Sequence, residues 1–136
     1  MEKPSNELIP KRLLIIGGAG GVGSIAIQLA KIVFGVQTVI ATASRPETKA
    51  YCLELGADFA INHYNDLKKE LDEIKIDGIE LALVATPLKN DLFVKLSELL
   101  TPFGKIVALS LGGDKLDFFP IFAKRGSLIM ELMFTR

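Results

Sequence analysis

The 136-residue sequence has no tryptophan, a single cysteine (Cys52) and a single histidine (His63). These counts exclude a disulfide framework, a zinc finger and a histidine-rich metal site. The sequence also has no net charge, because sixteen Lys and Arg residues balance sixteen Asp and Glu residues. This balance argues against nucleic-acid binding, which needs a basic surface to displace counterions from phosphates. A Ser-His-Asp triad is not excluded, but it would depend on His63 alone.

The composition is typical of one globular domain. Hydrophobic residues make up 49% of the chain and charged residues 24%, and the length suits a single domain over residues 1–136. Residues 1–12 contain no apolar run, so no secretory signal is expected and we expect a cytoplasmic location. Residues 13–30 lack charge over eighteen positions, but five of the seven residues from Gly17 to Gly23 are glycine, which would weaken a membrane helix. No membrane contact is expected.

Short apolar runs alternate with segments of helical periodicity. Strands are expected at 12–17, 37–41, 59–62, 79–85, 105–109 and 128–134. Helices are expected at 22–33, 47–55, 66–74, 91–100 and 118–124. Because helical crossovers between parallel strands are right-handed, this alternation predicts an α/β fold with a doubly wound parallel sheet of six strands and helices on both faces.

A glycine-rich turn follows the first expected strand and opens the first helix. It matches G-x-G-x-x-G with Gly18, Gly20 and Gly23, and Gly21 and Val22 stand between them. The first glycine permits a tight turn, the second lets the backbone approach a pyrophosphate, and the third lets helix and strand pack closely. The helix N-terminus adds unpaired N–H donors that suit an anion. The pattern predicts a Rossmann domain that binds a dinucleotide, and a turn needed only for packing is the alternative.

The end of the second strand favours NADP over NAD. A site that prefers NAD usually carries an acidic residue about twenty positions after the turn, where it binds the ribose 2′-hydroxyl. Here Ser44 stands 21 residues after Gly23, Arg45 follows it, and no acidic residue occurs from Ile40 to Arg45. A hydroxyl and a guanidinium can bind a 2′-phosphate, although Arg45 could also be an ordinary solvated loop residue. The nearest acidic residue, Glu47, lies in the expected first turn of a helix, where it complements the dipole.

Four segments carry a family resemblance. They are LLIIGGAGGVGSIAIQLAK (13–31), ATASRPETK (41–49), LGAD (55–58) and FGKIVAL (103–109). Together they resemble the medium-chain dehydrogenase/reductase superfamily, and within it the zinc-type alcohol dehydrogenase-like and quinone oxidoreductase branch. The resemblance runs from about Leu13 to the end of the chain. It implies a coenzyme-binding Rossmann domain and NADPH-dependent reduction of a carbonyl or activated alkene, such as a quinone or enone.

The resemblance also implies roles for residues that contact the coenzyme phosphates. Gly20, Gly21 and Val22 would meet the pyrophosphate. The residues around the adenosine 2′-phosphate would be Ser44, Arg45, Lys49 and Tyr64, the last of which matches a tyrosine that relatives place there. Lys49 as a helix-surface lysine and Tyr64 as a half-buried loop aromatic are the alternatives.

Other positions follow the fourth and fifth strands, at the sheet edge where ligands of such folds bind. Ala85, Thr86 and the segment from Leu109 to Leu111 would border the nicotinamide. No residue qualifies as a general acid or base, so no catalytic residue is assigned. Cys52 fits a helix and His63 a loop, and neither is given a metal-ligand role.

The chain departs from the resembled family in what surrounds the domain. Family members carry a catalytic domain before the coenzyme domain, and part of it returns afterwards. Here about a dozen residues precede the first strand, and the zinc ligands of the zinc-dependent branch are not in the sequence. We therefore expect an excised domain that binds NADP(H) without turnover; zinc in the parent enzyme stays open. The alternatives are a stand-alone dinucleotide-binding sensor and a methyltransferase, although a methyltransferase would carry an acidic residue where Ser44 and Arg45 stand.

The last apolar run predicts self-association. Its apolar residues are Leu128, Ile129, Met130, Leu132, Met133 and Phe134, interrupted by Glu131. An edge strand has unpaired backbone groups that tend to pair with another strand. Relatives in the resembled family join two coenzyme domains through the corresponding strand, so we expect a homodimer. An edge covered by a segment missing from the sequence is the alternative.

Overall fold

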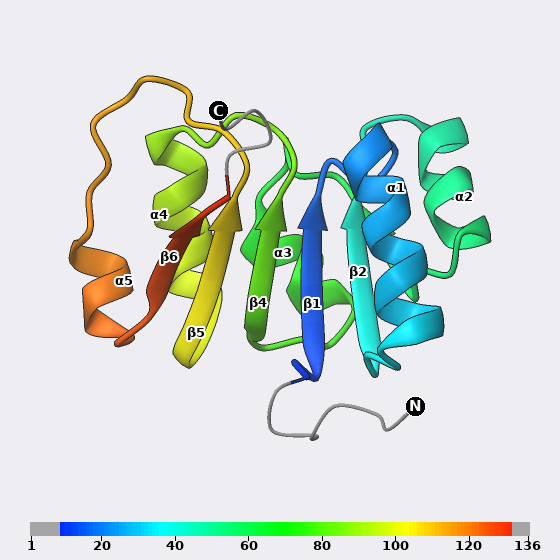
Figure 1. Cartoon of the computed structure of the whole chain (residues 1–136), viewed down its shortest axis with the longest axis horizontal. Coiled ribbons are helices and arrows are strands. Elements are labelled where there is room, and N and C mark those ends of the chain that lie inside the picture. Colours follow the sequence, from blue (N-terminus) through cyan, green and yellow to red (C-terminus); the bar gives the residue numbers. More distant parts are fainter. Residues whose placement is uncertain (1–8, 132–136) are drawn as a thin grey trace.

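The structure is a computed structural model that describes residues 9–131. Six strands form one sheet in the order β3-β2-β1-β4-β5-β6, and every neighbouring pair is parallel (Figure 1). This order confirms the predicted doubly wound Rossmann fold. Within residues 9–131, no helix is both long enough and apolar enough to cross a membrane.

The elements follow the predicted alternation. The strands are β1 (Arg12–Ile16), β2 (Thr38–Thr42), β3 (Phe59–Ile61), β4 (Ile79–Val84), β5 (Leu100–Ala108) and β6 (Ser127–Met130). The helices are α1 (Gly21–Gln28), η1 (Leu29–Val33), α2 (Pro46–Glu54), α3 (Leu67–Glu73), α4 (Asn90–Leu99) and α5 (Phe119–Ala123).

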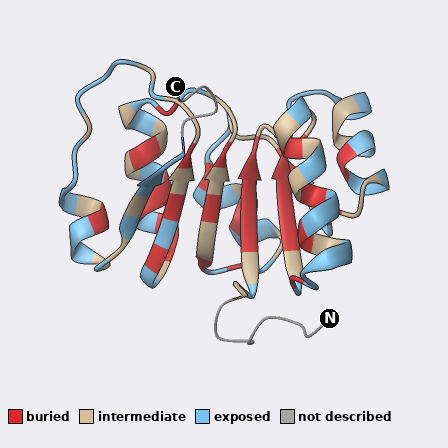
Figure 2. Cartoon of the chain, in the orientation of Figure 1, coloured by how far each residue is buried: buried red, intermediate tan, exposed pale blue. Residues whose placement is uncertain are grey.

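Two hydrophobic cores lie on the two faces of the sheet. The sheet separates them, and its strands are largely buried (Figure 2). Alternate residues of β1 serve each core: Leu13 and Ile15 pack with α1 and α2, whereas Leu14 and Ile16 pack with α3 and α4. Side chains alternate across a strand, so a strand covered on both faces must be apolar at every position. This explains the uninterrupted apolar run in the sequence.

Most element ends agree with the predictions within one residue, and three features differ more clearly. The first helix does not run unbroken to residue 33, because its last turn, η1, is a π-helix. β5 begins at Leu100 and not at Lys105. Leu100 pairs with Ile79, and a register shift follows before Lys105 pairs with Leu81. The residues after Leu100 give no indication of this pairing in the sequence. β6 ends at Met130, before Glu131, whereas Leu132, Met133 and Phe134 of the predicted edge strand lie outside the described residues.

The topology positions one ligand-binding edge. All six strands point the same way, so their carboxyl ends lie along one side of the sheet (Figure 1). The chain leaves β1 toward β2 and returns to β4 on the other side of β1. Loops that diverge at such a switch point leave a crevice where ligands of open α/β sheets bind.

Candidate functional site

Gly18, in the turn between β1 and α1, and Gly23, in the first turn of α1, are required by close packing. A Cβ on Gly23 would lie 2.1 Å from the carbonyl oxygen of Gly17, and a Cβ on Gly18 would lie 2.7 Å from the Cβ of Ala41. The motif predicts that its first glycine, Gly18, permits the tight turn. The structure corrects this role: Gly17 has the positive φ of 86°, whereas on Gly18 a side chain would collide with Ala41 and Cys52.

Gly20 and Gly21, in contrast, are not required by packing. The nearest atom to a Cβ on Gly20 would be 3.6 Å away, and a Cβ on Gly21 would meet nothing within 4 Å. Gly20 has a φ of −74°, which any residue can adopt. Packing within the chain therefore does not explain these two glycines, whereas close approach of a phosphate to the backbone does. The turn fits a dinucleotide in this respect.

The N-terminus of α1 offers hydrogen-bond donors. It has no side-chain cap and no acidic residue in its first turn. Among the described residues, no acceptor pairs with the N–H groups of Gly21, Val22 and Gly23, whereas the Ser24 N–H already donates to the Gly20 carbonyl oxygen. Unpaired donors at the positive end of a helix dipole form a site for an anion without any basic side chain.

Ser44 and Arg45 follow β2 and are exposed. Thr48 fixes the Arg45 backbone, because its hydroxyl donates to the Arg45 carbonyl oxygen at 3.0 Å and accepts from the Arg45 N–H at 3.2 Å. Sequence reasoning missed an ion pair between Arg45 Nε and Glu47 Oε1 at 3.7 Å. Both side chains are 68% exposed, so this pair is weak and leaves the guanidinium accessible to another anion.

A cavity of about 450 Å³ lies at the carboxyl edge, between the segment after β3 and the start of α4. It is lined by His63, Tyr64, Thr86, Pro87, Lys89, Asp91, Leu92 and Lys95. Tyr64 is 77% exposed, which rules out the half-buried alternative, and its ring lies 4.3 Å from that of His63. Lys49 lies on α2 and is partly buried. Lys89 and Lys95 of this cavity could not be recognised from the sequence.

The segments after β4 and β5 pair with each other. Leu88 donates to the Ser110 carbonyl oxygen at 3.0 Å and accepts from the Gly112 N–H at 2.9 Å, which forms a bridge between Leu88 and Leu111. Thr86 lies beside the glycine turn, because a Cβ added to Gly17 would be 3.1 Å from its Cγ2. Ala85 lies beside it, and the Leu109 N–H donates to the Val84 carbonyl oxygen at 3.4 Å.

Thr42 and His63 form a connection that sequence reasoning missed. Thr42 ends β2 fully buried, and its Oγ1 accepts from the Gly17 N–H at 2.9 Å. The same oxygen lies 2.8 Å from Nδ1 of His63. Burial lowers the pKa of His63 and raises that of Cys52, which lies in the core beneath the turn. The only sign of this connection in the sequence is the hydroxyl residue Thr42 at the end of an apolar strand.

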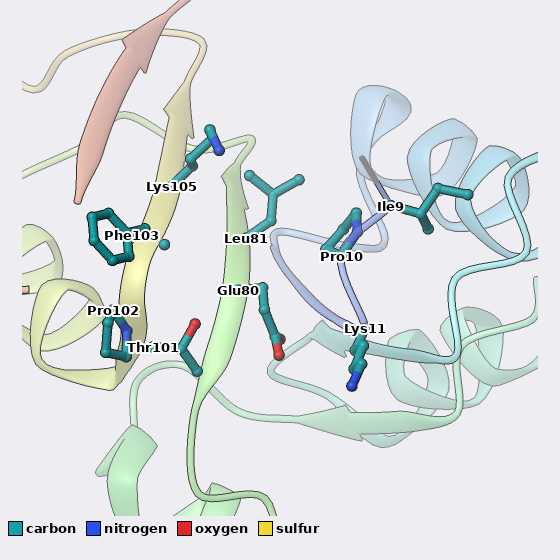
Figure 3. Close-up of a pocket in the computed structure, with 10 residues that line it drawn as sticks. Ile9, Pro10, Lys11, Glu80, Leu81, Thr101, Pro102, Phe103 and Lys105 are labelled. Atoms are coloured by element: carbon teal, nitrogen blue, oxygen red, sulfur yellow. The ribbon is translucent and has the colours of Figure 1, made fainter. Parts of the chain in front are cut away.

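Another cavity, of about 430 Å³, lies at the opposite edge of the sheet, where the strands begin (Figure 3). Its one acidic side chain, Glu80, is already paired with Arg12 Nη2 at 2.9 Å, and Arg12 also binds Asp77 at 2.8 Å. This cavity is separate from the glycine turn, because the turn follows the carboxyl end of β1 at the other edge of the sheet. Within residues 9–131, no three His, Cys, Asp or Glu side chains are grouped so that they could hold a metal ion.

Comparison with known proteins gives consistent matches. Residues 21–136 match a family described as zinc-binding dehydrogenases. A zinc-type alcohol dehydrogenase-like protein of Staphylococcus aureus (strain MRSA252) is 39% identical over 132 residues, which is 96% of this chain and 38% of that protein. The NADPH-dependent alkenal/one oxidoreductase of Arabidopsis thaliana is 36% identical over 123 residues, which is 87% of this chain and 32% of that protein.

A solved structure matches as well. A Rhizobium etli CFN 42 protein described as a zinc-dependent alcohol dehydrogenase superposes with a TM-score of 0.82 and 35% identity. The match covers 98% of this chain and 38% of that one. The chain thus spans less than half the length of each of these three proteins.

Proposed function

This chain belongs to the zinc-binding dehydrogenase family, and from that premise we propose that it binds a dinucleotide with the pyrophosphate at the N-terminus of α1. The observation that carries the proposal is the pair Gly20 and Gly21, which packing within the described residues does not require. The N–H groups of Gly21, Val22 and Gly23, at the same helix N-terminus, have no acceptor among these residues. Both features suit a phosphate that must approach the backbone closely. A turn that served packing alone would need Gly17, Gly18 and Gly23, but not Gly20 or Gly21.

The preferred coenzyme in this proposal is NADP(H). Ser44 and Arg45 stand where an NAD-binding site usually carries a carboxylate. Lys49 and Tyr64 lie on the neighbouring segments and would complete the site for the 2′-phosphate. The Arabidopsis thaliana relative, whose name includes NADPH, supports this choice.

The whole reaction would belong to a longer protein. Since the chain spans about 38% of the Staphylococcus aureus relative, we propose that it is the coenzyme domain of an oxidoreductase acting on a carbonyl, quinone or enone. A bound reduced nicotinamide would supply the hydride, and this chain would bind and orient the nicotinamide ring. Ala85, Thr86 and Leu109 to Leu111 would border that ring. By itself the chain would bind coenzyme without turnover. A stand-alone sensor module is the second candidate, and a catalytic domain encoded in the same reading frame would exclude it.

Calorimetric titration with NADPH and with NADH tests the coenzyme preference. NADPH is expected to bind at least tenfold more tightly than NADH. Arg45→Ala should weaken NADPH binding roughly tenfold and leave NADH binding unchanged, because it removes one charge-assisted hydrogen bond to the 2′-phosphate.

The matched variant is Glu47→Gln, which removes the carboxylate that competes for Arg45 and should tighten NADPH binding by a few fold. Equal affinities for NADPH and NADH would contradict the roles of Ser44, Arg45 and Lys49. No binding of either coenzyme would contradict the dinucleotide proposal itself.

We also propose that two chains associate through β6. This strand is at the edge of the sheet, and its residues Ile129 and Met130 are each 38% exposed. Unpaired backbone groups on an apolar edge favour pairing with a second copy across a two-fold axis. The proposal extends no further than Met130, because the rest of the apolar run lies outside the described residues.

Light scattering at high micromolar concentration should give the mass of a dimer. Ile129→Lys should shift the chain to a monomer, since a charge on an edge strand opposes strand pairing. The control is Ile32→Lys on the η1 helix, which should leave the dimer intact; Ile32 is 76% exposed. A wild-type monomer, or equal effects of the two substitutions, would count against this interface.

A further inference from the structure

We propose that His63 is a positioning residue for the glycine-rich turn and acts through Thr42. In this proposal the neutral imidazole accepts a hydrogen bond from the Thr42 hydroxyl, which in turn accepts the Gly17 N–H. Coenzyme affinity then depends on the protonation state of a side chain that follows β3. The inference rests on the proposed dinucleotide site and adds two residues to it.

Thr42 holds both of the first two peptide groups of the turn. Its side-chain oxygen accepts the Gly17 N–H at 2.9 Å, and its carbonyl oxygen accepts the Gly18 N–H at 2.9 Å. Thr42 and Ser97 are the only buried polar side chains among the described residues. Ser97 bonds only within its own helix, to the Phe93 carbonyl oxygen at 2.7 Å, whereas Thr42 links β2, the turn and the segment after β3.

The position of Gly17 sets the position of the α1 N-terminus. The Gly17 carbonyl oxygen accepts the Gly20 N–H at 3.3 Å. It also lies directly under Gly23, where an added Cβ would be 2.1 Å away. A shift of the Gly17 backbone would therefore displace the N–H groups of the α1 N-terminus, which would face the phosphate. Such a displacement weakens charge-assisted hydrogen bonds, which depend on distance and angle.

The hydrogen-bond network assigns the tautomer of His63. A backbone N–H can only donate, so Thr42 Oγ1 is the acceptor for Gly17 and its own hydrogen points elsewhere. The hydroxyl oxygen could accept a second hydrogen bond, but among the described residues its own hydrogen has no other acceptor, so we assign His63 Nδ1, at 2.8 Å, as that acceptor. The ring proton then lies on Nε2, and the imidazole is neutral. Protonation at Nδ1 would turn this acceptor into a donor and leave the buried hydroxyl hydrogen without its partner.

The surroundings of His63 also favour the neutral form. Burial lowers its pKa from the ordinary 6.5. The ionisable groups that share its cavity are Tyr64, Lys89, Asp91 and Lys95, and Glu70 binds the Asn62 N–H in the same segment. The two lysines disfavour a positive imidazolium, and the two carboxylates oppose them. Because the folded-state pKa is lowered, the neutral form dominates at neutral pH and the ordered turn is lost as the pH falls through that pKa.

NMR spectroscopy tests the network without any coenzyme. His63 is the only histidine, so its imidazole signals need no assignment by mutation. The wild-type chain should show the Nε2–H tautomer and a pKa below 6.5. The Gly17 amide should be protected from hydrogen exchange, and its protection factor should fall as His63 becomes protonated. An Nδ1–H tautomer, or Gly17 protection that does not follow the His63 titration, would overturn the proposal.

Two substitutions of Thr42 connect this network to binding. Thr42→Val keeps the shape but removes the hydroxyl, so it should raise the His63 pKa, lower Gly17 protection at least tenfold and weaken NADPH binding about tenfold. Thr42→Ser keeps the hydroxyl and should restore wild-type values. Unchanged protection and affinity in a folded Thr42→Val chain would overturn the proposal. If Thr42→Val does not fold, the wild-type titration decides; if the wild type binds no dinucleotide, the proposed function fails while the NMR results still decide the role of His63.

Discussion

Replacing Gly23 with alanine is expected to unfold the chain or destabilise it by roughly 4 kcal/mol or more, at the extreme of single-substitution effects. The added methyl group would lie 2.1 Å from the Gly17 oxygen, 2.8 Å from the Gly18 Cα and 2.9 Å from the Gly17 carbonyl carbon. All three are backbone atoms, so no side chain can rotate to make room. Relief requires α1 to move away from the end of β1, which would open the core that Ile27 and Ile15 share.

Gly21→Ala is the matched control, two residues earlier in the same helix. Its added methyl group would meet nothing within 4 Å, and alanine favours a helix by about 1 kcal/mol over glycine. This variant should be as stable as the wild type or slightly more stable. Urea unfolding followed by circular dichroism measures both. Similar midpoints for the two variants would contradict the account of Gly23 as a packing position.

The fold could be predicted from the sequence because its signals are local and repeated. Each central strand is buried on both faces, so its apolar run is continuous, and each helix shows its own periodicity. The boundaries that were wrong depend on partners distant in sequence. Leu100 joins β5 only because Ile79 lies beside it, and no property of the residues from Leu100 to Gly104 indicates this.

The site could be predicted in part for the same reason. The glycine spacing located the turn, but it did not reveal which glycines serve packing, because Ala41 and Cys52 approach Gly18 from other elements. The connection from Gly17 through Thr42 to His63 joins residues separated by more than twenty positions. Spacing in a single sequence carries no sign of such a contact. The pairing of Arg45 with Glu47 was missed although the two are close in sequence, because Arg45 precedes the helix that holds Glu47.

Gly20→Val separates coenzyme binding from folding, and it should weaken NADPH binding roughly a hundredfold. Gly20 has an extended backbone that valine can adopt, and the nearest atom to an added Cβ is 3.6 Å away. The loss of stability should stay near 1 kcal/mol, the usual cost of an unfavourable residue at a helix N-cap. The branched side chain would stand at the N-terminus of α1 and keep a phosphate from the N–H groups of Gly21 and Val22.

The measurement pairs calorimetric titration with urea unfolding for Gly20→Val, wild type and Gln28→Ala. Gln28 is exposed at the far end of α1, so its substitution should change neither affinity nor stability appreciably. A hundredfold loss of affinity corresponds to about 2.7 kcal/mol of binding free energy, which clearly exceeds the expected change in folding. If Gly20→Val folds and binds NADPH as the wild type does, the pyrophosphate does not lie at this turn. The glycine at this position would then have no role in binding a phosphate.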